Sequence, residues 1–196
     1  MFGRIGREAP AIDTAFVLTI SDGVAAGTRQ DASGDALAER LSGLGYALDR
    51  GVVPDDIPAI VSEVIAQVGR CQLLVATGGT GLGPRDVTPQ ALGQVLDYEI
   101  PGFGEVMRAA GRLATPMADL SRSLAGARGN TLVIAVPGSV SGATESLDAL
   151  VPLLAHALET LGGHTDHGSG EGGSAEGAGE AEGGAGDHAN HQPGAS

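Results

Sequence analysis

The chain has 196 residues and is 42% hydrophobic, which is enough for one domain with a sizeable core. Its formal net charge of −13, with eleven Arg and no Lys, argues against a nucleic-acid or anionic-membrane partner, because both require a basic surface. The missing Lys also excludes a Walker-A P-loop, a protein-kinase site and a Schiff-base mechanism.

Strand-like and helix-like patterns alternate along residues 14–161. Short apolar runs predict strands at 15–20, 71–77 and 131–136, and YALDRGVV at 46–53 is also predicted to be a strand. Apolar residues at helical spacing predict helices at 33–44, 57–69, 88–97, 103–114 and 143–162. Repeated strand, helix and strand units are typical of a parallel sheet covered on both faces. We therefore predict an α/β fold, a three-layer α/β/α domain with a mostly parallel sheet.

Local signals mark the faces and starts of these helices. The helix at 33–44 presents an apolar face made of Leu37, Leu41 and Leu44. The next helix presents an apolar face made of Ile57, Ile60, Val61, Val64, Ile65 and Val68. Thr88 is predicted to be the N-cap of the third helix, and Pro89 its first helical residue.

Composition divides the chain into three segments. We expect residues 1–13 to be a flexible N-terminus and residues 14–161 to form the folded domain. Residues 162–196 contain no aliphatic side chain larger than Ala, so they cannot bury enough surface to offset the entropy of ordering. A disordered acidic tail of Gly, Ala, Glu and His is therefore predicted. Its histidines could chelate a transition metal, but a flexible spacing specifies no geometry, and a solubilising tail is the alternative.

Cys71 is the one cysteine, which excludes an intramolecular disulfide and a cysteine-rich zinc site. It opens an apolar run, so we expect it to be buried in the core. The N-terminus lacks the apolar segment of a signal peptide, and no stretch approaches the roughly 18 apolar residues of a membrane span. We therefore expect a soluble cytoplasmic protein without a membrane partner.

A glycine-rich loop, TGGTGLGPRDVTP at 77–89, follows the third predicted strand. Glycine has no Cβ, so the backbone can approach a ligand closely and present consecutive N–H groups to an anion. An ordinary tight connection between a strand and a helix is the alternative. The loop is not a dinucleotide fingerprint, because Pro84 stands where a third Gly is required, and this disfavours a Rossmann oxidoreductase.

Polar residues follow each predicted strand, and ligands of such sheets bind at the carboxyl ends of the strands. The four ends lead into Ser21-Asp22-Gly23, Pro54-Asp55-Asp56, the glycine loop with Arg85-Asp86, and Pro137-Gly138-Ser139. Together they suggest carboxylates that hold a hard cation beside backbone amides that hold phosphates. Taken singly, Asp56 and Asp86 have an alternative role, because each could cap or buttress the helix that follows it.

Motifs in a fixed order carry a family resemblance: TISDGVAAGTRQDASG, VVPDD, TGGTGLGPRDVTPQA, EIPGFGEVMR, LSRSLAG and GNTLVIAVPGS. Over residues 14–161 the sequence resembles the MogA/MoaB family of molybdenum-cofactor biosynthesis, which includes the gephyrin G domain. TGGTG followed by RDVTP is the most specific of these motifs. The resemblance implies the molybdopterin-binding fold, a homotrimer, and transfer of AMP from Mg-ATP to molybdopterin, which gives adenylyl-molybdopterin and pyrophosphate. A molybdate-insertion enzyme is an implied partner.

The resemblance also implies site residues. Asp55 of VPDD and Asp86 of RDVTP match the two acidic residues that the family needs for catalysis, and both are expected to ligate Mg²⁺. Gly23 stands where many members carry an Arg, so a charge near the substrate is missing at this position. The implied nucleotide and pocket positions are Ser21, Asp22, Gly78, Gly79, Thr80, Gly81, Ser121, Pro137, Gly138 and Ser139.

The implied chemistry joins two anions, so positioning and charge neutralisation must carry most of the catalysis. Without Lys, the protein would rely on Mg²⁺, Arg and backbone N–H groups. One alternative is a MoaB-type molybdopterin-binding or scaffolding trimer without adenylylation activity, and another is a related nucleotide-cleaving or molybdate-inserting activity. The presence of both Asp55 and Asp86 favours the adenylyltransferase, because a binding module has less need of two carboxylates.

Overall fold

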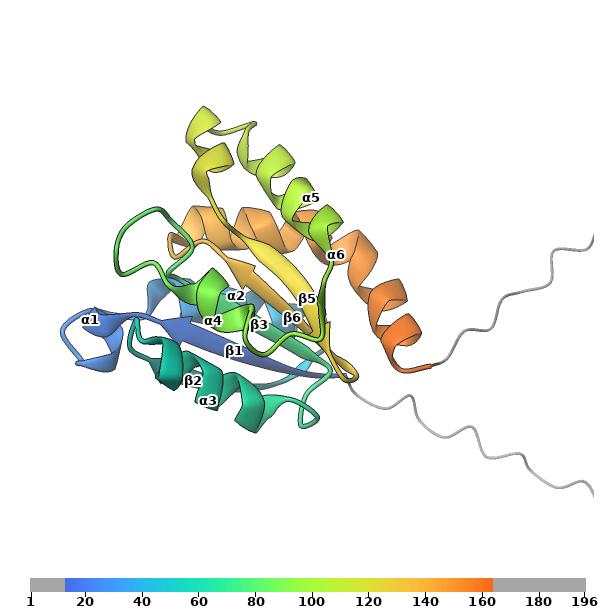
Figure 1. Cartoon of the computed structure of the whole chain (residues 1–196). Helices are drawn as coiled ribbons and strands as arrows, with labels where there is room; N and C mark the ends of the chain where they lie inside the picture. Colours follow the sequence, from blue (N-terminus) through green and yellow to red (C-terminus); the bar gives the residue numbers. More distant parts are fainter. Residues whose placement is uncertain (1–12, 164–196) are drawn as a thin grey trace, which may run out of the picture. The chain divides into compact units, whose positions relative to one another are not determined.

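The computed structural model describes residues 13–163, so nearly all of the predicted N-terminal segment 1–13 and predicted tail 162–196 lie outside the described residues. Within that range, one six-stranded sheet has helices on both faces (Figure 1). The strands are β1 Thr14–Ile20, β2 Ala47–Val53, β3 Leu73–Thr77, β4 Tyr98–Glu99, β5 Leu124–Arg128 and β6 Thr131–Val136. Their order across the sheet is β2-β1-β3-β6-β5-β4.

The strands β2, β1, β3 and β6 run parallel, whereas β5 pairs antiparallel with β6, and β4 antiparallel with β5. Side chains alternate between the two faces, so Val17 joins the core on one side of β1 and Leu18 joins the core on the other. Strands buried on both faces form continuous apolar runs. For this reason the buried strands β1, β3 and β6 lie close to their predicted bounds. The edge strand β2 also lies close to its predicted bounds, although most of its residues are exposed or half-buried.

Two helical layers cover the sheet. The helices α2 Ala32–Gly43, α5 Pro101–Gly111 and α6 Val140–Leu161 pack on one face, and α3 Ile57–Gln67 and α4 Thr88–Leu92 pack on the other. Two short elements are α1 Asp22–Ala25, which follows β1, and the 3-10 helix η1 Pro116–Leu120. The prediction of a three-layer α/β/α fold with a mostly parallel sheet is confirmed.

The helices are held by apolar side chains that face the sheet. Leu37 and Leu41 of α2 and Ile60 and Val64 of α3 are fully buried. Burial of one such side chain stabilises the fold by about 1.5–3 kcal/mol. The predicted apolar faces extend too far, however, because Leu44 is 41% exposed and Ile65 is 54% exposed. Leu44 lies beyond the last residue of α2, and Ile65 is rotated by about 100° from Val64 around the helix axis.

The antiparallel edge formed by β4 and β5 was not predicted from the sequence. The sequence of β5, LAGAR, lacks the β-branched residues that make β6 recognisable. Gly126 is required in β5 because a Cβ there would lie 2.5 Å from the backbone carbonyl oxygen of Tyr98. The two-residue connection Gly129-Asn130 between β5 and β6 is a hairpin signal that could have revealed this pair.

The predicted start of the third helix is wrong by one residue. Thr88 is the first residue of α4 rather than its N-cap, and Pro89 is the second. The N-cap is Val87, whose side chain makes no capping hydrogen bond. The hydroxyl of Thr88 instead donates to the carbonyl oxygen of Gly78 at 2.8 Å. A hydrogen bond to the glycine loop therefore replaces the predicted cap.

Cys71 is 8% exposed, which confirms its predicted place in the core. Burial raises the pKa of its thiol to about 11. Among the helices that the structure describes, none combines the length and apolar character needed to cross a membrane.

Candidate functional site

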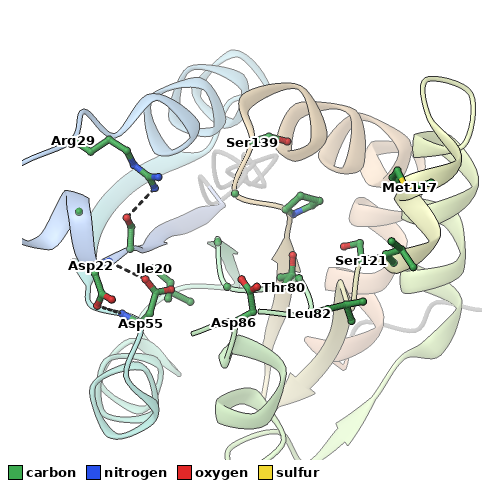
Figure 2. Close-up of a pocket in the computed structure, with 18 residues that line it drawn as sticks. Ile20, Asp22, Arg29, Asp55, Thr80, Leu82, Asp86, Met117, Ser121 and Ser139 are labelled. Atoms are coloured by element: carbon green, nitrogen blue, oxygen red, sulfur yellow. Dashed lines mark hydrogen bonds between the residues drawn. The ribbon is translucent and has the colours of Figure 1, made fainter. Parts of the chain in front are cut away.

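An open pocket of about 760 Å³ lies at the carboxyl ends of the parallel strands (Figure 2). It is lined by every residue that the sequence assigned to the site: Ser21, Asp22, Asp55, Gly78, Gly79, Thr80, Gly81, Asp86, Ser121, Pro137, Gly138 and Ser139. Five further residues that were not predicted from the sequence also line the pocket: Ile20, Arg29, Leu82, Met117 and Leu120. Gly23 lines it as well.

The glycine loop requires its first two glycines. Gly78 and Gly79 have φ angles of 108° and 61°, in the left-handed region that disfavours other residues. A Cβ on Gly78 would collide with the carbonyl oxygen of Ile20, and a Cβ on Gly79 with the hydroxyl of Thr88. The loop therefore lies directly against β1 and α4, with no space for side chains between them.

The carbonyl groups of this loop are bound to the protein. Thr88 donates through its hydroxyl to Gly78 at 2.8 Å and through its N–H to Gly79 at 3.1 Å. Arg122 donates through its N–H to Thr80 at 2.8 Å and through Nε to Gly81 at 2.8 Å. The N–H groups of Gly79, Thr80 and Gly81 donate to no other residue between 13 and 163. The loop can therefore offer them to an anionic ligand.

Asp86 closes the far end of the loop. Its Oδ2 accepts the N–H of Gly83 at 2.8 Å, and its own N–H donates to the carbonyl oxygen of Gly83 at 3.0 Å. The carboxylate therefore buttresses the loop and does not cap α4. Gly81 makes this approach possible, because a Cβ there would lie 2.8 Å from Oδ2. Oδ1 accepts no hydrogen bond from the described residues, so one carboxylate oxygen remains for a ligand.

Asp55 is held by Asp22 at the other side of the pocket. The N–H of Asp22 donates to Oδ2 of Asp55 at 2.9 Å, and the N–H of Asp55 donates to Oδ1 of Asp22 at 3.0 Å. Oδ1 of Asp55 faces the glycine loop and accepts no hydrogen bond within the described part of the chain. Like Asp86, Asp55 therefore combines one bound oxygen with one that is available.

Asp22 has its charge matched by Arg85, whose Nε and Nη2 donate to the carboxylate at 3.0 and 2.8 Å. These hydrogen bonds lower the pKa of Asp22 below its ordinary value of 3.8, and they raise the pKa of Arg85. Asp56 takes the alternative role that its sequence position allowed, because its side chain accepts the N–H of Ala59 and caps α3. Asp55 and Asp86 are the two pocket carboxylates that are not paired with Arg.

The N-terminus of α6 forms another wall of the pocket. Ser139 is its N-cap and accepts the N–H of Gly142 at 3.2 Å. Gly138 packs against the glycine loop, since a Cβ there would lie 3.1 Å from Cα of Gly78. The start of a 22-residue helix carries a partial positive charge, which favours an anion.

The donor groups fit a hard cation shared with a ligand. Within residues 13–163, no three His, Cys, Asp or Glu side chains gather into a metal site. The available oxygens are those of the two carboxylates Asp55 and Asp86, which line the same pocket as the glycine loop. Mg²⁺ is typically held by one or two carboxylates together with substrate phosphates. The residues present therefore suit Mg²⁺ bound with a phosphate ligand better than a site built from protein alone.

The two ends of the pocket differ in character (Figure 2). Asp22, Arg29 and Asp55 lie at one end, and Leu82 and Met117 lie at the other beside Ser121. Leu82 and Met117 are 68% and 60% exposed, so this end of the pocket presents apolar side chains to solvent. Such a pocket is suited to a ligand with a charged part and a flat apolar part.

The chain resembles known proteins over most of the described region. Residues 16–156 match the family model described as a probable molybdopterin binding domain. A molybdenum cofactor biosynthesis bifunctional protein of Chlorobaculum tepidum is 40% identical over 149 residues, which are 75% of this chain and 48% of the relative. This chain therefore spans about half the length of that relative.

Two further relatives match over most of their own length. A molybdopterin adenylyltransferase of Helicobacter pylori is 36% identical over 155 residues, which cover 76% of this chain and 87% of the relative. The molybdopterin biosynthesis enzyme MoaB from Thermus thermophilus, whose crystal structure is known, is 44% identical in sequence to this chain, and the two structures are similar with a TM-score of 0.73. That match covers 77% of this chain and 97% of the solved one.

Proposed function

The chain belongs to the molybdopterin-binding domain family of molybdenum-cofactor biosynthesis, and from this premise we propose that it is a molybdopterin adenylyltransferase. The reaction joins a phosphate oxygen of molybdopterin to the α-phosphorus of ATP. The bond between that phosphorus and the oxygen of the β-phosphate breaks, and pyrophosphate leaves. One observation carries the proposal: the glycine loop has its carbonyl groups bound by Thr88 and Arg122 and its N–H groups available, and the same pocket contains two carboxylates with one available oxygen each.

The phosphates of ATP fit the N–H groups of Gly79, Thr80 and Gly81 and the N-terminus of α6. These donors are held in place before the ligand arrives, because Arg122 and Thr88 bind the loop from behind. Preorganised donors cost no reorganisation when charge develops in the transition state. The apolar end, with Leu82 and Met117, fits a planar ring.

Asp55 and Asp86 would hold Mg²⁺, which neutralises charge on the phosphates when it is bound. The protein's own part is to keep the two carboxylates in place, through Asp22 on one side and Gly83 on the other. Burying the reacting phosphates among N–H groups also orients them for transfer. Orientation of this kind accounts for a large share of the rate in phosphoryl-type transfer.

The direct test is incubation of the purified chain with molybdopterin and Mg-ATP, followed by mass spectrometry of the products. We expect adenylyl-molybdopterin and one equivalent of pyrophosphate. The matched control is the double variant Asp55→Asn, Asp86→Asn, which keeps the side-chain size and should bind molybdopterin but form little product. If the wild-type chain binds both substrates and forms no adenylyl-molybdopterin, the assignment fails.

A second candidate is a molybdopterin-binding or scaffolding protein without transfer activity. It is favoured by the similarity to the solved MoaB protein at 44% identity. In the same experiment this candidate predicts bound, unmodified molybdopterin and no pyrophosphate. A related nucleotide-cleaving activity would give AMP or ADP without the adenylyl product.

We also propose that the protein is a cytoplasmic homotrimer and passes its product to a molybdate-inserting enzyme. Leu113, which is 92% exposed beyond the end of α5, is the kind of apolar surface residue that a subunit contact would cover. Sedimentation equilibrium at micromolar concentration should give three times the chain mass. A monomer mass would reject the trimer and leave the pocket unaffected.

A further inference from the structure

We propose that Arg29 and Ser21 form a phosphate-binding pair at the charged end of the pocket. The inference deepens the proposed function and rests on it, because it identifies which additional side chains would hold a phosphate group of the substrates. Arg29 lines the pocket, and it is the one cationic side chain among the described residues that do so. Figure 2 shows it above Asp22 and Asp55, directed toward the pocket.

Arg29 is not engaged by a carboxylate. Its Nη2 donates to the hydroxyl of Ser21 at 2.9 Å, and its side chain makes no other hydrogen bond to residues 13–163. Most other arginines in this range are occupied. Carboxylates accept from Arg40, Arg50, Arg85, Arg112 and Arg128, and backbone carbonyls accept from Arg108 and Arg122. Arg29 therefore keeps most of its N–H donors for a ligand.

The hydroxyl of Ser21 is arranged in the same way. It accepts two hydrogen bonds, from the N–H of Val24 at 3.3 Å and from Arg29 at 2.9 Å. A hydroxyl oxygen has two lone pairs, so both are used, and the hydroxyl proton is left to donate. Ser21 is buried at 5% exposure, and its proton has no acceptor in the described chain. An anion in the pocket would supply that acceptor.

The backbone that carries Arg29 is fixed before any ligand binds. The carbonyl oxygen of Gly23 accepts the N–H groups of Thr28 and Arg29 at 2.9 and 3.0 Å, so the loop folds back over α1. Asp31, two residues further on, accepts the hydroxyl of Thr19 at 2.8 Å and Nη2 of Arg50 at 2.7 Å. These bonds reduce the ordering cost of using a flexible side chain.

Position 23 lies beside Arg29, and a Cβ there would make only ordinary van der Waals contact with it. A Cβ on Gly23 would lie 3.4 Å from Cβ of Arg29 and 4.0 Å from its Nε. The family resemblance implied that a charge is missing at position 23. The structure instead places a guanidinium beside that position from six residues further along the chain, and nothing in the local sequence pattern indicated this.

The charge balance of the pocket indicates what Arg29 binds. Asp22 is paired with Arg85, whereas Asp55 and Asp86 leave two negative charges beside the glycine loop. An anionic substrate therefore needs positive charge in addition to backbone N–H groups. A planar guanidinium offers two parallel N–H donors, which match two oxygens of a phosphate group. Either the nucleotide or the terminal phosphate of molybdopterin could supply this group.

The test is isothermal titration of wild-type, Arg29→Ala and Arg29→Lys proteins with Mg-ATP, AMP, pyrophosphate, molybdopterin and adenosine. Loss of a charge-assisted hydrogen bond should weaken binding about tenfold to a hundredfold in Arg29→Ala. Arg29→Lys should recover part of this loss, because it keeps the charge without the planar fork. Adenosine has no phosphate, and its affinity should not change. If Arg29→Ala binds the nucleotide ligands more weakly, the pair binds a phosphate group of ATP. If only its affinity for molybdopterin falls, the pair binds the phosphate of the pterin substrate.

Arg70→Ala is the matched control, because it also removes one Arg side chain. Arg70 lies beside Cys71, at the opposite edge of the sheet from the pocket. An equal loss of affinity in this control, or unchanged affinity of Arg29→Ala for every phosphate ligand, would overturn the proposal. Arg29 is exposed, so the melting temperature should not change. Binding of pyrophosphate and AMP needs no turnover. Absence of adenylyl-molybdopterin from wild-type protein would therefore reject the proposed function, and the titrations would still test this pair.

Discussion

Asp22 and Asp55 are joined by two reciprocal hydrogen bonds, in which each backbone N–H donates to the other residue's carboxylate, at 2.9 and 3.0 Å. The pair connects the end of β1 to the end of β2, and Arg85 from the glycine loop completes it by binding Asp22. Three strand ends therefore depend on the carboxylate of Asp22. We interpret Asp22 as a positioning residue for Asp55.

Replacing Asp22 tests this interpretation. Asp22→Ala removes the acceptor of the Asp55 N–H and the partner of Arg85, so we expect turnover to fall about a hundredfold, as for other misplaced catalytic groups. Asp22→Asn keeps an acceptor oxygen and should retain much more activity than Ala. Asp148→Ala is the control, because it breaks another exposed ion pair, with Arg40, outside the pocket. Equal turnover of the Asn and Ala variants would contradict positioning through the hydrogen bond.

Asp86→Asn separates charge from shape in the glycine loop. Asn can still accept the N–H of Gly83, so the melting temperature should change little. The lost charge should reduce turnover by about a hundredfold or more, about 3 kcal/mol, with a smaller effect on molybdopterin affinity. Steady-state kinetics, titration and thermal unfolding measure the three quantities. Wild-type turnover in the Asn variant would remove Asp86 from the catalytic residues and leave it as a buttress.

Gly81→Ala tests the close approach between the loop and Asp86. The added Cβ would lie 2.8 Å from Oδ2 of Asp86, so the carboxylate must move. We expect a loss of turnover similar to that of Asp86→Asn, because movement of the carboxylate also displaces Oδ1, the oxygen that is available to the ligand. In contrast, Gly43→Ala meets no atom within 4 Å in α2 and should raise stability by about 0.4–1 kcal/mol without affecting turnover. Full activity of Gly81→Ala would show that the approach is unimportant.

Cys71 provides a pH prediction for the core. Burial raises its pKa to about 11 from an ordinary value of 9.0, so the folded state keeps the thiol protonated where the unfolded state loses its proton. Its contribution to stability is therefore complete below pH 9 and declines as the pH rises toward 11. Unfolding in denaturant should show a steeper loss of stability over this range than in Cys71→Ala. Iodoacetamide should label native protein slowly at about pH 8 and unfolded protein quickly, and rapid native labelling would refute the burial.

The sequence alone was sufficient to place most of the residues assigned to the pocket along one edge of the sheet. Their position follows from a local rule, because they follow predicted strands and parallel strands end at the same edge. Ser121 is the exception, because it was assigned from the family resemblance and precedes β5. Continuous apolar runs identified β1, β3 and β6, and helical periodicity identified the helices of the two covering layers. The antiparallel pair of β4 and β5 lacked such a signal, because LAGAR owes its strand conformation to its neighbours.

Only the tertiary structure decided how these residues are used. The bond from Arg122 to Gly81 spans 41 positions of sequence, and the bond between Asp22 and Asp55 spans 33. Hydrogen bonds of this range depend on how strands and loops pack, which local periodicity does not encode. They determine that Asp22 is paired while Asp55 and Asp86 keep an available oxygen. The same packing brings Arg29 against Ser21, because the loop after α1 folds back onto the carbonyl group of Gly23.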